Sequence, residues 1–174
     1  MNSFLLQGLQ HPFLTPSHLI ILVGLGVLFG QQGFSHSRNS ILAFIFAALI
    51  GAWTHRLYPI PINIEVALLA MAAAIGILCA LRLKLPIWIT VLFALFCGVL
   101  IGQDSAPVMI PGIKITKIYT SLAGSILSAT LFLGFISIIA LPLRKFFQGI
   151  PLRVLGSWIF ASSVMVLAFQ FSTK

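Results

Sequence analysis

Acidic side chains are almost absent from this sequence. Its 174 residues include two Asp and Glu against ten Lys and Arg, and charged residues make up only 7% of the chain. A soluble globular domain has about 25% charged residues, whereas 60% of this chain is hydrophobic and its mean hydropathy is +1.14. The composition therefore excludes an ordinary soluble fold and predicts an integral membrane protein.

The net charge of +8 does not indicate a nucleic-acid partner. In a soluble chain such a balance is typical of nucleic-acid binding. Here the cations stand singly or in pairs between apolar segments, which is the pattern of membrane topology signals. We therefore expect a lipid bilayer, and no nucleic acid, around this chain.

Cysteines and catalytic motifs are scarce as well. Cys79 and Cys97 both lie inside apolar runs, and an isolated pair in such positions is no disulfide framework. The sequence has no phosphate loop, dinucleotide-binding fingerprint or HExxH motif, and no secretory signal precedes its first apolar segment. We expect a protein that is no enzyme, has no permanently bound cofactor and inserts through its own helices.

Six segments are apolar and long enough to cross a membrane, which takes about 20 residues in a helix. Clusters of Gly, Pro and charged residues separate them, and no linker divides them into domains. We therefore expect an all-α polytopic bundle of about six transmembrane helices, forming one integral membrane domain over residues 1–174. The expected spans are residues 15–31, 39–55, 63–81, 86–101, 118–143 and 152–171.

An even number of spans places both termini on the same side of the membrane, and the positively charged residues in the loops predict which side that is. The loops on one side of the membrane carry six cations. The segments on the other side carry four cations, and the negative charge of Asp104 offsets one of them. The positive-inside rule puts the larger set in the cytoplasm and both termini outside a bacterial inner membrane or its equivalent. The larger set is Arg38, Arg82, Lys84, Arg144, Lys145 and Arg153, and the smaller set is Arg56, Lys114, Lys117 and Lys174.

This orientation gathers most of the ionisable side chains near the outer ends of the spans. Only His36 falls in a cytoplasmic loop. The outer group is His11, His18, His55, Glu65 and Asp104. Two further motifs, GVLFG at residues 26–30 and GVLIG at residues 98–102, have the small-xxx-small spacing that lets helix backbones approach closely.

Glu65 stands near the start of an apolar segment with no cation in the same turn. Ionisable groups at membrane depth are costly unless they face a partner, an ion or water, so Glu65 is a candidate binding residue. The alternative is that it sits at the interface beside Asn63, where a carboxylate suits the helix dipole. The residues alone leave both interpretations open.

His11 and His18 flank two prolines in HPFLTPSH. The prolines predict a helix that begins near Thr15 or Pro16, with His18 in its first turn. Neutral imidazole binds nickel, cobalt, zinc and copper, so the pair predicts part of a metal site at the outer mouth. The alternative is a pair of hydrogen-bonded interfacial histidines.

Cys97 and Asp104 are seven residues apart and share one face of a helix that continues through Gly102. A thiolate and a carboxylate would extend the coordination shell of the histidines. The alternatives are plain packing for Cys97 and a turn position for Asp104.

Several of these motifs resemble the HupE/UreJ family of small membrane proteins, which are found with hydrogenase and urease genes and regarded as nickel or cobalt permeases. The resemblance runs over about residues 8–171. His11, Pro12 and His18 match the family's opening HP-x-x-G-x-D-H motif, and the segments PINIE, LKLP, ALFCG and QDSAP fall in the frame of later motifs.

The sequence departs from the family pattern at five positions. Thr15 and Ser17 replace a glycine and an aspartate, Cys97 and Ile101 replace two histidines, and Asp104 replaces a glutamate. The retained residues are His11, His18 and Glu65, together with the carboxylate at Asp104.

The resemblance implies a secondary permease for a divalent transition metal of the nickel or cobalt class. His11, His18 and Glu65 would bind the ion at the outer mouth, and Asp104 and Cys97 would pass it inward. A second hypothesis is a non-transporting structural or assembly subunit of a larger membrane redox or energy-converting complex. A third is the substrate-binding component of a multi-subunit importer. A homo-oligomer or a larger membrane complex stays open as the quaternary state.

Overall fold

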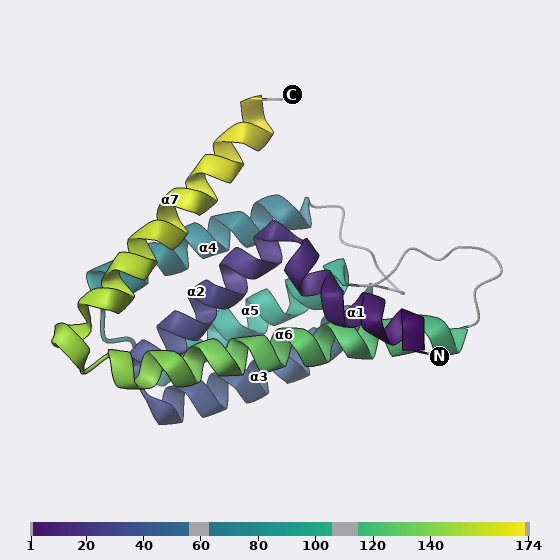
Figure 1. The fold of residues 1–174 in the computed structure, drawn as a ribbon, viewed down its shortest axis with the longest axis horizontal. Helices are drawn as coiled ribbons and strands as arrows, with labels where there is room; N and C mark the ends of the chain where they lie inside the picture. The colour runs from purple at the N-terminus through teal and green to yellow at the C-terminus, as the bar shows by residue number, and fades with distance from the viewer. Residues whose placement is uncertain (1, 56–62, 106–114, 173–174) are drawn as a thin grey trace.

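The computed structural model describes residues 2–55, 63–105 and 115–172. These residues form helices and short connections, with no strand among them, which confirms the predicted all-α bundle (Figure 1). The helices are α1 (Asn2–Leu14), α2 (Pro16–Gln32), α3 (Phe34–Thr54), α4 (Ile64–Leu81), α5 (Ile87–Asp104), α6 (Ile115–Leu143), the 3-10 turn η1 (Phe146–Gly149) and α7 (Ile150–Ser172).

Helices α2 to α7 each overlap one of the six predicted spans, and they alternate in direction through the bundle (Figure 1). Five of them, α3 to α7, are long and apolar enough to cross a membrane, and α1 with α2 makes a sixth candidate as a bent pair. Large apolar side chains such as Phe46, Leu131 and Phe135 point outward from the bundle. Such an exterior suits lipid, so the chain is a polytopic membrane protein.

The central helix is α2, which contacts each of the other α-helices. Both predicted packing motifs lie at close helix crossings. A Cβ added at Gly26 or Gly30 of α2 would lie 2.6 Å from Ile136 Cγ2 or 2.4 Å from Ala140 Cβ on α6, and one added at Gly102 of α5 would lie 2.2 Å from the Ala48 carbonyl oxygen on α3. The small residues therefore set these interhelical distances, as the motifs predicted.

Helix α1 is the element that the sequence did not predict. Pro12 lies inside it, although a proline removes the hydrogen bond to the carbonyl four residues earlier. That carbonyl belongs to Gly8, and it accepts a hydrogen bond of 3.0 Å from Ser125 Oγ on α6 instead. Because a neighbouring helix supplies the missing donor, α1 continues to Leu14.

The connection between α2 and α3 is shorter than predicted. The sequence placed His36 in a loop before a helix beginning at residue 39, but α3 begins at Phe34 and includes His36. Gly33 alone makes the turn, with φ 120° and ψ 174°, a backbone conformation that only glycine adopts without strain.

Gly33→Ala is therefore expected to lower the free energy of unfolding by about 1–3 kcal/mol. Two costs combine: the strain of the backbone at this φ, and a contact of 2.5 Å between the new Cβ and Arg144 Nη1. Thermal unfolding of the detergent-purified protein measures the effect. Gly134→Ala is the matched control, since a Cβ at Gly134 meets nothing within 4 Å, and an equal loss in both variants would contradict the explanation.

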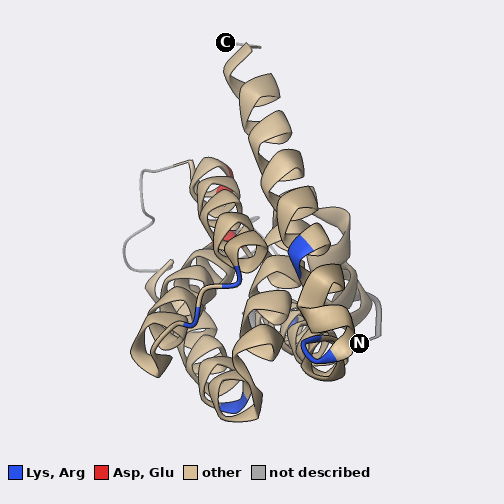
Figure 2. Ribbon diagram, turned by 90° about the vertical axis from the view of Figure 1, so that its left-hand side faces the viewer, with Lys and Arg blue, Asp and Glu red and all other residues tan. Residues whose placement is uncertain are grey.

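Six cations lie at one end of the bundle, where α2, α4 and α6 end and α3, α5 and α7 begin. Figure 2 looks onto this end, with Lys and Arg in blue. We call it the cationic end; it carries Arg38, Arg82, Lys84, Arg144, Lys145 and Arg153. The two acids, Glu65 at the start of α4 and Asp104 at the end of α5, lie at the opposite end. Of the four cations predicted there, Lys117 is on α6, and Arg56, Lys114 and Lys174 lie outside the described residues.

Candidate metal site

A sharp bend between α1 and α2 brings His11 and His18 together. The two helix axes differ in direction by 73°. Thr15 sits in the bend with an extended backbone, which the following Pro16 favours, and its Oγ1 donates a hydrogen bond of 3.2 Å to the His11 carbonyl.

In a continuous helix, residues seven positions apart are separated by about 10 Å along the axis. The bend reduces the separation of the two imidazole ring centroids to 5.4 Å, with the rings edge to face. The HPFLTPSH segment thus folds the last turn of α1 over the first turn of α2, as the prolines predicted for the start of α2.

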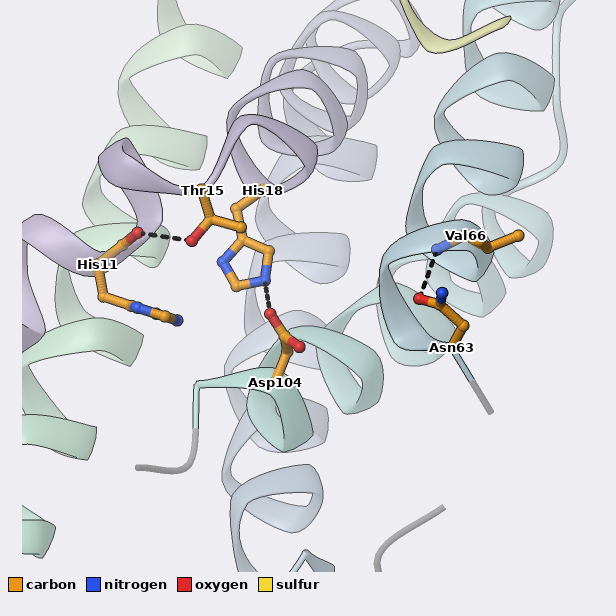
Figure 3. Close-up of polar contacts among 6 residues, drawn as sticks. All are labelled: His11, Thr15, His18, Asn63, Val66 and Asp104. Atoms are coloured by element: carbon orange, nitrogen blue, oxygen red, sulfur yellow. Dashed lines mark hydrogen bonds and ion pairs between the residues drawn. The ribbon is translucent and has the colours of Figure 1, made fainter. Parts of the chain in front are cut away.

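Asp104 approaches the same point from the end of α5. Its Oδ2 lies 2.9 Å from His18 Nε2 (Figure 3). The His18 side chain is fully buried, whereas 32% of the Asp104 side chain is exposed. The pair therefore has one member inside the bundle and one member accessible from its surface.

The three side chains form one donor group. One ligand atom from each of His11, His18 and Asp104 can be chosen so that all three lie within 4.8 Å of one another. Within the described part of the chain, the buried His11 Nε2 and His18 Nδ1 have no hydrogen-bond partner. A metal ion with bonds of about 2.0–2.2 Å holds its ligands about 3–4 Å apart, so a small movement of the side chains would let all three bind.

The chemistry of the group suits a borderline divalent cation. Two imidazoles and a carboxylate are ligands for nickel, cobalt, zinc or manganese, whereas copper(I) prefers thiolates and thioethers. Three protein ligands leave coordination positions for water. The contact between His18 Nε2 and Asp104 Oδ2 holds the two side chains next to each other.

Two residues expected in the site lie elsewhere. The Cys97 side chain is fully buried in the hydrophobic core, two turns before Asp104 and thus about 10 Å away along α5. Glu65 lies in the first turn of α4, after an N-cap in which Asn63 Oδ1 accepts the Val66 amide at 3.4 Å (Figure 3). The helix dipole favours a carboxylate there. Neither residue belongs to the three-residue group.

His55 is a neighbour of the group, although the sequence indicated only that it lies near the outer end of a span. It caps the C-terminal end of α3, close enough to Asp104 for an electrostatic interaction between the two side chains. Its Nδ1 is buried and has no hydrogen-bond partner among the described residues. Beside it, Gln103 Nε2 donates to Thr54 Oγ1 at 3.3 Å and ties the ends of α3 and α5 together. The nearness of His55 to Asp104 was indicated in the sequence only by the predicted topology, which placed both residues at the same end of the bundle.

Comparison with known proteins identifies the family of this chain. A family model described as "HupE / UreJ protein" matches residues 1–166. The chain belongs to the HupE/UreJ family. This family is linked to nickel and cobalt transport rather than to catalysis, and its match covers every residue of the donor group. Searches of curated proteins and of solved structures gave no match for this HupE/UreJ protein.

Proposed function

We propose that this HupE/UreJ protein is a secondary permease for a divalent transition metal, nickel or cobalt, and that it first binds the ion at His11, His18 and Asp104. The observation that carries the proposal is the convergence of these three side chains within 4.8 Å at one end of a membrane bundle. They come from three helices, and Asp104 lies far from the histidines in the sequence.

A small ligand set suits a transport site, because the ion must bind well enough to enter and weakly enough to leave. The exposed fraction of Asp104 gives the ion a route from solvent. The buried His18 then holds the ion at the start of the bundle interior. Further along α5, Ile101 and Cys97 are buried in the hydrophobic core. Passage beyond the first site therefore requires the helices to move, as in other alternating-access carriers.

Proteoliposomes test the transport function. The reconstituted protein is expected to admit Co²⁺ or Ni²⁺ to a metal-sensitive dye trapped inside, and Asp104→Asn, which keeps the side-chain shape, is expected to slow uptake strongly. His36→Ala, a histidine change at the cationic end, is the matched control. A wild-type protein that binds the ions without moving them would refute the permease and favour an assembly subunit.

The proposal includes an orientation in which the site faces outward. Positive charge gathers in cytoplasmic loops of membrane proteins, and six cations lie at the end opposite to the donor group. We therefore infer that the cationic end faces the cytoplasm and that both termini lie outside.

Cysteine labelling tests this orientation. Lys117 and Arg38 are both exposed, at opposite ends of the bundle. A membrane-impermeant maleimide is expected to label Lys117→Cys in intact spheroplasts and Arg38→Cys only after permeabilisation. The native Cys79 and Cys97 are fully buried and provide an unlabelled background. The reverse labelling pattern would overturn the orientation.

A further inference from the structure

A cavity of about 750 Å³ opens at the cationic end. It lies among the end of α2, the connection between α4 and α5, and the connection between α6 and α7. Two arginines and two lysines line it, together with uncharged polar groups. The lining residues that matter here are Arg82, Lys84, Arg144, Lys145, Gln32 and His36.

Hydrogen bonds hold the walls of this cavity in place. Gln32 Nε2 donates to the Leu83 carbonyl at 2.7 Å, and its Oε1 accepts the Leu85 amide at 3.0 Å, so the backbone on both sides of Lys84 is held. Arg82 ends α4 in a left-handed conformation. Its guanidinium donates to the carbonyls of Gln148 and Arg144 and thereby joins the two connections. These hydrogen bonds therefore fix the backbone that carries the four cations.

No acidic side chain of this protein neutralises the four cations. The chain has only two acids, and both lie at the opposite end of the bundle, on α4 and α5. Like charges around one cavity repel each other, and solvent screens this repulsion least at Arg144, which is partly buried, whereas the other three cations are exposed. An anion from outside the chain would remove this cost.

The position of the cavity relative to the membrane indicates what kind of anion it would bind. Helices α4 and α5 each have 18 residues, which gives a length of about 27 Å and nearly spans a hydrocarbon core of about 30 Å. The cavity at their ends therefore lies at the level of the lipid phosphates. Guanidinium groups bind phosphate oxygens in pairs, and basic pockets between helices on the cytoplasmic side bind anionic headgroups.

We propose that this cavity is a binding site for a phosphate group, carried by an anionic phospholipid or by a soluble phosphate compound. The proposal does not depend on metal transport. Bound phosphate would join the connection between α4 and α5 to that between α6 and α7, and it would stabilise the bundle at the end opposite to the donor group.

Native mass spectrometry of the full chain tests the site with phosphatidylglycerol and phosphatidylcholine as probes. The wild-type protein is expected to retain phosphatidylglycerol preferentially. Each cation near a headgroup contributes about a fivefold change in binding, so Lys84→Gln with Arg144→Gln is expected to weaken retention about 25-fold. Arg38→Gln is the matched control, because Arg38 lies at the same end but does not line the cavity; it is expected to change retention far less than the double variant does.

A second measurement separates the two sources of phosphate. Inorganic phosphate and ATP are added to the delipidated protein in detergent, and thermal unfolding is followed. If phosphate or ATP raises the unfolding temperature of the wild-type protein but not that of the double variant Lys84→Gln with Arg144→Gln, the cavity binds a soluble phosphate compound. If neither compound stabilises the protein and phosphatidylglycerol alone is retained selectively, the cavity binds lipid. The single variant Lys145→Gln, which changes an exposed side chain, repeats both tests if the double variant fails to fold. Equal losses in Arg38→Gln, or no binding of any probe, would overturn the proposal.

Discussion

His18→Ala is expected to weaken nickel or cobalt binding by at least about 100-fold. Loss of partners outside the coordination shell of a metal already costs 10–100-fold in affinity, and His18 is proposed to bind the ion directly. The His18 side chain is fully buried, and alanine provides no ligand atom in its place. Isothermal titration of the purified protein with Ni²⁺ and Co²⁺ measures the change.

Two further variants separate loss of a ligand from general damage. Asp104→Asn keeps the shape of the side chain and an oxygen that accepts from His18 Nε2, but it removes the charge, so it is expected to weaken binding without unfolding the protein. Cys97→Ala changes a core residue outside the donor group and is expected to leave the affinity unchanged. A loss in Cys97→Ala as large as that in His18→Ala would show that the thiol binds the ion, as the sequence analysis predicted.

Gly102→Ala is expected to destabilise the bundle by about 1–3 kcal/mol, the usual cost of overpacking. The new Cβ would lie 2.2 Å from the Ala48 carbonyl oxygen, a backbone atom that cannot move without shifting α3. This cost remains after the higher helix propensity of alanine, worth about 1 kcal/mol, is counted. The midpoint of thermal unfolding in detergent measures it.

Gly134→Ala on α6 is the control for this change, because it gains the same propensity and its Cβ meets no atom within 4 Å. It is expected to unfold at the same or a higher temperature than the wild-type protein. Gly102 also precedes Asp104 by two residues, so Gly102→Ala is expected to weaken metal binding even in the fraction that remains folded. Equal stability of the two variants would contradict the close crossing of α3 and α5.

The spans and their order were predictable because lipid imposes a local rule on the sequence. Backbone polar groups in the hydrocarbon have no water to bind, and a continuous helix satisfies them within the segment itself, so apolar length and breaking residues alone mark α2 to α7. The rule does not cover α1. Its proline at position 12 would break an isolated helix, and only the hydroxyl of Ser125 on α6, far along the chain, supplies the missing donor.

Composition and spacing alone predicted a membrane bundle with few ionisable groups, a helix that begins near Pro16 with His18 in its first turn, and Asp104 at the same end as the two histidines. Which of these groups contact one another depends on how the helices pack. The tertiary structure joined His11, His18 and Asp104, left Cys97 in the core and Glu65 at a helix start, and brought His55 alongside. The physical reason is that spacing along one helix determines which face a side chain occupies, whereas contacts between helices depend on crossings that small residues such as Gly102 permit.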